Sequence, residues 1–232
     1  MSIADKLTAV AENQQKVYDA GYEKGKAEGG GRDHLRLCNA PNFPGLGVFD
    51  EEEVTLNFDY AYEVNRMVYS DWGEPFYQNA KVKHLTLNFA QKLIYARQMF
   101  APSPVDTVLE HLTINADLSQ STNAIRMIGS CTALKVVDGT PIDLSSATQI
   151  ENILMYGYAV EEVRFAPNTI KVAIGFVDNS NLSDASIQSI IDGLADLTGS
   201  AAQTVTFHAD VGAKLTAEQK STISGKNWTL VY

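Results

Sequence analysis

Apolar and polar residues alternate in a short pattern that recurs along the chain. The four clearest copies hold five residues each and read VTLNF at 54–58, LTLNF at 85–89, LTINA at 112–116 and VTFHA at 205–209. Strict alternation over such a stretch is typical of a strand with one buried and one solvated face. We therefore expect a short strand at each copy.

The spacing of the copies predicts the fold class. In the frame of the repeat, the steps from Leu85 to Leu112, Val137 and Val163 are 27, 25 and 26 residues. Intervals of this length are typical of a solenoid in which each coil holds one strand and one return segment. The sequence thus predicts an α+β repeat solenoid over residues 50–180, with short parallel strands.

The first 28 residues carry a different period and predict a helix. Its apolar seam has alternating spacings of four and three and consists of Ile3, Leu7, Val10, Gln14 and Val17. Three heptads are too short to be stable alone in water, so we expect a stem that forms a homo-oligomer or docks on a larger assembly. A single amphipathic helix that lies on its own domain is the alternative. Gln14 suits more than one oligomeric state, which leaves the number of chains open.

Two further segments complete the expected domain organisation. Residues 29–49 are rich in Gly and Pro, and we expect a joint followed by an N-terminal cap of the coils. Residues 181–232 predict a C-terminal cap. Ser183 is expected to cap a helix with an apolar face that extends to Leu197, before Gly199. Thr216 and Gln219 predict a capping box for a second helix that ends at Gly225, and residues 228–232 predict a last strand.

Charge and cysteine content narrow the expected partners. The chain has 18 Lys and Arg against 28 Asp and Glu, a formal charge of −10, which argues against binding to nucleic acid or anionic lipid. We expect no membrane insertion, because no segment approaches the roughly 18 apolar residues of a membrane span. The start of the chain lacks the pattern of a signal peptide, so synthesis in the cytoplasm is expected. Cys38 and Cys131 have no metal-type spacing, and Cys131 suits a small core residue.

No motif with a catalytic mechanism emerges from the sequence. The histidines form no HxxH or HExxH arrangement, and neither a phosphate-binding loop nor a nucleophile elbow is present. His84 and His111 share one repeat position, where they could stack and hold a metal, but packing or solubility alone explains such convergence better. We expect a non-enzymatic protein with no catalytic residue, metal or cofactor.

Aromatic residues give the clearest binding candidates. They fall in two groups: Tyr60, Tyr62, Trp72 and Tyr77 after the first strand, and Tyr156 and Tyr158 around Gly157. Tyr and Trp gather at protein interfaces because they offer rigid, amphipathic contact area. The 31-residue step from Val54 to Leu85 indicates an enlarged coil, where binding loops are common. Both groups are expected to bind a protein or a cell-surface glycan, unless they fill a wide first coil instead.

Residues 128–137, IGSCTALKVV, resemble the coils of the BspA-like leucine-rich repeat family, whose pattern is Phe-x-x-Cys/Asn-x-x-Leu-x-x-Leu. Cys131 and Asn79 fall on its Cys/Asn position, and the resemblance covers roughly residues 50–180. Residues 182–230 resemble a C-terminal module of such proteins encoded by phages and prophages of Firmicutes. Residues 17–26 are similar to their N-terminal segments.

The resemblance implies leucine-rich-repeat-like coils that act as a binding or adhesion surface. It favours a virion-associated structural or recognition protein, a tail, fibre or decoration component that is made in the host cytoplasm and binds a host receptor or another protein. A bacterial surface adhesin and an intracellular interaction scaffold are the alternatives. The ligand, the part of the particle and the binding face stay open.

Overall fold

The computed structural model describes residues 35–37, 52–58, 61–64, 81–100 and 108–232. The chain divides into two compact units, Met1–Leu35 and Arg36–Tyr232, and the described residues other than Leu35 belong to the second. The predicted stem, with Ile3, Leu7, Val10, Gln14 and Val17, lies outside the described residues, as does most of the joint at 29–49. The predictions for the stem and for the domain boundaries stay predictions.

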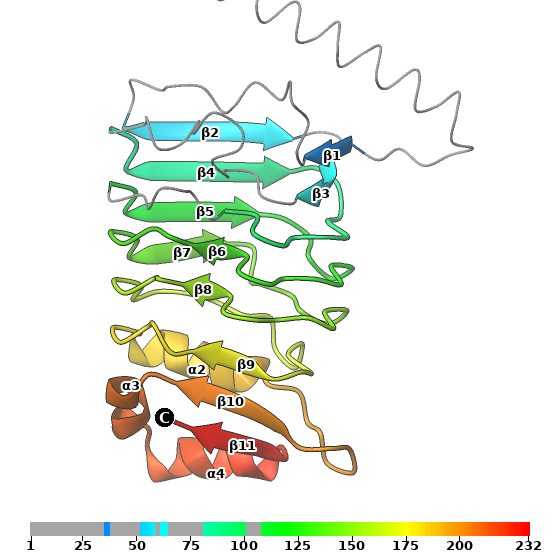
Figure 1. The fold of residues 1–232 in the computed structure, drawn as a ribbon, viewed down its shortest axis with the longest axis vertical. Coiled ribbons are helices and arrows are strands. Elements are labelled where there is room, and N and C mark those ends of the chain that lie inside the picture. Colours follow the sequence, from blue (N-terminus) through cyan, green and yellow to red (C-terminus); the bar gives the residue numbers. More distant parts are fainter. Residues whose placement is uncertain (1–34, 38–51, 59–60, 65–80, 101–107) are drawn as a thin grey trace, which may run out of the picture. The chain divides into compact units, whose positions relative to one another are not determined.

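Short strands dominate the described residues, and helices occur near the C-terminal end (Figure 1). The strands are β1 (Leu35–Leu37), β2 (Glu53–Phe58), β3 (Ala61–Val64), β4 (His84–Phe89), β5 (His111–Asn115), β6 (Ile128–Gly129), β7 (Val136–Gly139), β8 (Leu154–Met155), β9 (Ile174–Phe176), β10 (Gln203–Phe207) and β11 (Trp228–Val231). The helices are α2 (Asp184–Gly193), α3 (Ala209–Lys214) and α4 (Ala217–Gly225). The sheets have the orders β2-β4-β5-β7, β6-β8, β9-β10-β11 and β1-β3.

The four-stranded sheet has the register that the sequence pattern predicts. Its strands are parallel, and they pair Val54 with Leu85, Leu85 with Leu112, and Leu112 with Val137. These four residues are buried, so the apolar positions of the repeat form one column in the core. The strands expected at 54–58, 85–89 and 112–116 are confirmed, whereas the solenoid class of the whole chain stays a prediction.

The return segments also repeat, more closely in backbone conformation than in sequence. Ile128 pairs with Leu154 in parallel between β6 and β8. Three non-glycine residues share a left-handed backbone with φ near +50°: Gln98, Arg126 and Asn152. Ser130 and Tyr156 form a second such pair, with φ of 56° and 57°. Gln, Arg, Ser and Tyr do not favour positive φ, so pairing with the neighbouring segment imposes the conformation on them, whereas asparagine adopts it more readily.

Residues of alternating charge stand just before the four strands of the β2-β4-β5-β7 sheet and before Glu162, which forms a parallel bridge with Val136 of β7. The residues concerned are Glu52, Lys83, Glu110, Lys135 and Glu161. From Lys83 onward, the backbone amide of each residue donates to the carbonyl of the one before it in this column, with N···O distances of 2.8–2.9 Å. The ammonium of Lys83 lies 3.1 Å from the carboxylate of Glu52. Opposite charges on adjacent strands favour this register over a slipped one.

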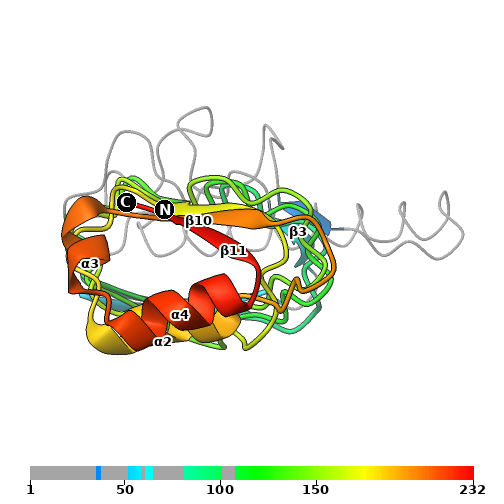
Figure 2. The same cartoon turned by 90° about the horizontal axis from the view of Figure 1, so that it is seen from below.

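The C-terminal cap has helices on one side and strands on the other. Figure 2 shows α2 and α4 on one side and β10 on the opposite side. Ser183 caps α2 and bonds the amide of Ser186, as predicted, and the Ser186 hydroxyl in turn accepts the amide of Val163 at 2.9 Å. The capping box of Thr216 and Gln219 is present at the start of α4, which ends at Gly225. Each of these predicted caps is confirmed.

Three details of the cap differ from the prediction. Helix α2 ends at Gly193, because Leu194 leaves it with extended backbone and pairs with Ile170, so Leu197 lies outside the helix. The ammonium of Lys226 lies 2.7 Å from the carbonyl oxygen of Leu194 and so stabilises this early end. The strand expected at 205–209 ends at Phe207, because His208 caps α3, a helix that the sequence analysis missed. It also missed β9, which pairs with β10.

The core lies between the two sides of the stack. Its largest fully buried side chains are Phe100, Phe176, Phe207, Leu85, Leu87, Leu93, Met99, Leu109 and Leu112. The ring of Phe176 packs edge-on against Phe165 and stacks on Phe207, with centroid distances of 5.8 Å in both pairs. Cys131 is buried and its thiol bonds the carbonyl of Gly129, as expected for a small core residue. The aromatic rings thereby join the repeat to its cap.

Two glycines with positive φ test how closely successive strands approach. At Gly139 (φ 97°), a Cβ would overlap the carbonyl oxygen of Ile114 and lie 2.8 Å from Oδ1 of Asn115. At Gly199 (φ 84°), a Cβ would meet nothing within 4 Å. We expect Gly199→Ala to lower the free energy of unfolding by about 1 kcal/mol through backbone strain alone. Gly139→Ala should lower it by about 3 kcal/mol, since strain and overlap add. Equal losses in urea denaturation would contradict the close approach at β5 and β7.

Candidate functional site

Tyr156 and Tyr158 form an exposed aromatic pair just after β8. They lie on either side of Gly157, and their side chains are 44% and 49% exposed. The ring centroids are 6.2 Å apart and the rings are tilted by 40°. The structure thus brings together the two tyrosines that the sequence analysis named as one group of binding candidates.

The backbone of Tyr156 is held in an unfavourable conformation. Its φ of 57° lies in the left-handed region, which a bulky aromatic residue adopts only under constraint. Asp178 supplies part of the constraint, because its Oδ2 accepts the Tyr156 amide at 2.9 Å. The residue in the same backbone conformation one coil earlier is Ser130, a much smaller residue. The chain therefore places a large ring where a small side chain serves elsewhere, an outlier that suggests function.

Two asparagines fix the loop that carries the tyrosines. Asn179 is buried, and its Nδ2 donates to the carbonyls of Leu154 at 3.2 Å and Gly157 at 2.8 Å. Asn181 Nδ2 donates to the carbonyl of Tyr158 at 2.8 Å. A Cβ at Gly157 would lie only 3.0 Å from Nδ2 of Asn179, so glycine permits this close contact. The two rings consequently stand on a rigid base.

Asn179 was not among the predicted site residues, although its spacing in the repeat indicates its position. Phe176, Asn179 and Leu182 follow one another at steps of three, as Ile128, Cys131 and Leu134 do. The repeat frame therefore continues for one more turn after the point where the strand pattern is lost. Extending the frame would have placed an amide under the tyrosine loop.

The other predicted aromatic group is not described. Tyr60, Trp72 and Tyr77 lie outside the described residues, and Tyr62 falls within β3 with its side chain likewise undescribed. A binding role for these four residues stays a prediction. Val177, the neighbour of Asp178 in the chain, is 47% exposed and adds apolar surface near the tyrosine loop.

The two histidines of the repeat are neighbours, as their shared position predicts. His84 pairs with His111 in register, and the ring centroids are 5.5 Å apart. Nε2 of His111 lies 2.9 Å from Oδ2 of Asp138, off the direction of a well-formed hydrogen bond, and the Thr113 hydroxyl donates to Oδ1 of Asp138 at 2.6 Å. Burial raises the pKa of Asp138, but the contacts with Thr113 and His111 outweigh it and lower the pKa overall. Within the described ranges, no group of three or more His, Cys, Asp or Glu is placed to hold a metal ion.

Comparison with known proteins assigns no family. No protein-family model, no curated protein and no solved structure matches the chain. Among the residues that the structure describes, no helix is long and apolar enough to cross a membrane. The tyrosine pair, which rests on geometry alone, is therefore the best-supported candidate site.

Replacing Tyr156 by glycine tests the strain at this site. We expect Tyr156→Gly to raise the free energy of unfolding by about 1 kcal/mol, because glycine adopts φ near +57° without the penalty that Tyr156 carries. Tyr158, whose φ is not positive, is the matched control, and Tyr158→Gly should lower stability by roughly 0.5–1 kcal/mol. Urea unfolding measures both changes. A similar loss in the two variants would show that the backbone at Tyr156 is unstrained.

Proposed function

We propose that the chain is a non-enzymatic recognition protein. In this proposal its coils form a leucine-rich-repeat-like solenoid that displays Tyr156 and Tyr158 to a protein or a cell-surface glycan. The observation that carries the proposal is the exposed Tyr156 ring on a left-handed backbone fixed by Asp178. A large ring that is kept exposed although its backbone is strained favours a role in binding over a role in folding.

The geometry of the pair suits binding without rearrangement. Asn179 and Asn181 anchor the loop carbonyls, so little loop entropy would be lost when a ligand binds. A tyrosine pairs an apolar ring face with a hydroxyl group, which matches both the C–H face of a sugar and an apolar side chain of a protein. Both ligand classes fit the two tilted rings.

A virion-associated role is the second part of the proposal, and it rests on the resemblance to leucine-rich repeat proteins of phages and prophages. A tail, fibre or decoration component would be made in the host cytoplasm and would present the repeat surface to a host receptor or to another particle protein. The predicted stem, with Ile3 and Leu7 in its seam, would oligomerise or anchor it. A bacterial surface adhesin and an intracellular scaffold are the other roles compatible with the same surface.

Binding to whole bacterial cells and to a glycan array tests the tyrosine pair. The full chain is compared with the double variant Tyr156→Ser and Tyr158→Ser, which should bind about tenfold more weakly because each ring removed is a central aromatic contact. The control is Tyr232→Ser, since Tyr232 is 53% exposed and follows β11, which forms the opposite edge of the three-stranded sheet from β9. Undiminished binding by the double variant, or an equal loss in the control, would contradict the proposal.

Light scattering tests the stem. The full chain should have the mass of an oligomer, and deletion of residues 1–28 should reduce it to a monomer, because the seam would be lost. A monomer in both cases would rule out self-association through the stem and leave docking on a partner as its role.

A further inference from the structure

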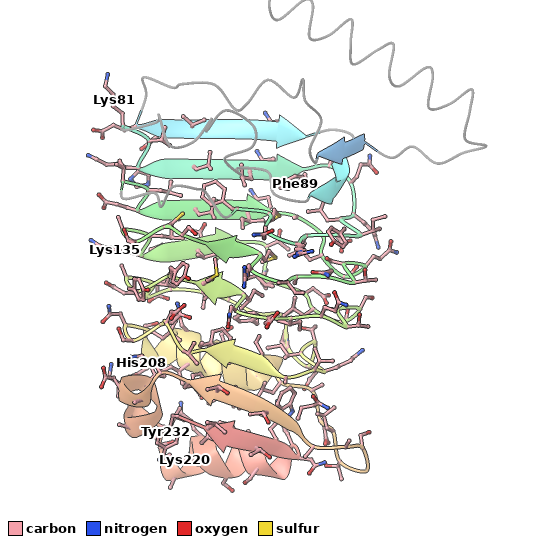
Figure 3. All side chains as sticks on the ribbon, in the orientation of Figure 1. Lys81, Phe89, Lys135, His208, Lys220 and Tyr232 are labelled. Carbon is pink, nitrogen blue, oxygen red and sulfur yellow. The ribbon has the colours of Figure 1, made fainter. Side chains whose placement is uncertain are left out.

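A second candidate site lies away from the tyrosine loop, at the carboxyl ends of β4, β5 and β7. It is an open hollow of about 570 Å³, and its apolar lining includes Phe89, Pro141 and Pro167. Figure 3 labels Phe89 at the carboxyl end of β4. The polar side chains that line the hollow are Asn115, Asp117, Thr140 and Asp143.

A ladder of side-chain amides ends at this hollow. Nδ2 of Asn88 donates to Oδ1 of Asn57, and Nδ2 of Asn115 donates to Oδ1 of Asn88, both at 2.8 Å. Thr140 follows β7 and is the residue beside Asn115 in register, but its side chain has no amide group. Oδ1 of Asn115 therefore receives no amide from a further rung in the described part of the chain. Hydrogen bonds in series polarise one another, which makes this last oxygen a good acceptor.

Two carboxylates stand at equivalent places in successive coils. Oδ1 of Asp117 accepts the Ser119 amide at 3.0 Å, and Oδ1 of Asp143 accepts the Ser145 amide at 2.8 Å. The hydrogen bonds from Ser119 lower the pKa of Asp117. Lys92 lies 3.4 Å from Oδ2 of Asp117, in an exposed contact of the kind that is weak and readily exchanged. The lowered pKa keeps Asp117 ionised at neutral pH, and a backbone amide holds each of the two carboxylates in place.

The side chains that line the hollow favour a ligand that donates hydrogen bonds, because most of their polar atoms are acceptors. The amide oxygen and the two carboxylates accept, whereas the side-chain donors among the described lining residues are the Thr140 hydroxyl and the second N–H of the Asn115 amide, whose first N–H bonds Asn88. Among the described residues that line the hollow there is no lysine or arginine, although Lys92 contacts Asp117. A sugar would bring as many acceptors as donors, whereas a guanidinium group has five donors and no acceptor. Its aliphatic stem would pack against the proline and phenylalanine walls.

We infer that this hollow binds an arginine-bearing segment of a partner protein, with the guanidinium group between Asp117 and Asp143 and near Oδ1 of Asn115. Charge complementarity supports this occupant, because the chain has a net charge of −10 and the hollow concentrates carboxylates beside apolar walls. The inference does not depend on the tyrosine pair, so either site can fail alone.

The probe for this site is a fluorescent peptide, acetyl-Gly-Arg-Gly-Arg-Gly-amide, titrated with the full chain in 0.15 M salt. Its citrulline analogue has the same shape without charge and should bind at least about tenfold more weakly. The double variant Asp117→Asn and Asp143→Asn should lose about tenfold in affinity. Asparagine retains the oxygen that accepts the Ser119 and Ser145 amides, so the turns should persist.

The matched control is the double variant Glu151→Gln and Glu218→Gln, which changes the net charge equally at exposed residues outside the hollow. It should change the affinity by less than about twofold. A second variant, Thr140→Arg, places a guanidinium group at the hollow and should block the peptide. The inference is overturned if both double variants lose affinity equally, if the citrulline peptide binds as well, or if Thr140→Arg binds normally.

Discussion

The parallel pairing of each repeated strand with the next is the interaction on which the rest of the structure depends. A single short strand has little apolar surface to bury and leaves its backbone groups unpaired, so it gains both core contacts and hydrogen bonds from its neighbours. Once Leu85 pairs with Leu112, the rest of β4 from His84 to Asn88 falls into register with β5. The apolar column, the amide ladder at Asn88 and Asn115, and the alternating charges around Lys83 are consequences of that one alignment.

The sequence predicted the strands and caps well because their signals are local and chemical. Alternation identifies a strand such as β4, and the oxygen atoms of Ser183 and Thr216 cap helices wherever such helices begin. Conformations that depend on a neighbouring coil could not be predicted in this way. Arg126 has no intrinsic tendency to positive φ, and the end of α2 depends on the pairing of Leu194 with a residue more than twenty positions earlier.

In the candidate sites, too, the residues could be named from the sequence, whereas their conformation and contacts could not. The sequence alone indicated Tyr156 and Tyr158, because two tyrosines around a glycine are conspicuous, but the strain at Tyr156 follows from contacts with the next coil. Asp117 and Asp143 are the second residues of two similar segments 26 residues apart, ADLS and IDLS, so comparison of the return segments could have identified them. Their proximity to the end of the amide ladder required the register of the strands. A repeated residue in the sequence can therefore be assigned to a surface site only when the register of the strands is known.

Cysteine pairs across the sheet test this alignment most directly. In a chain with Cys38→Ser, the in-register pair Thr86→Cys and Thr113→Cys should oxidise readily to a disulfide, because adjacent strands lie roughly 4.8 Å apart. The offset pair Thr86→Cys and Asn115→Cys, two residues out of register at roughly 8 Å, should not. Peptide mapping by mass spectrometry measures both yields. Efficient cross-linking of the offset pair, or none in either, would contradict the register from which this account of the fold and its two sites is built.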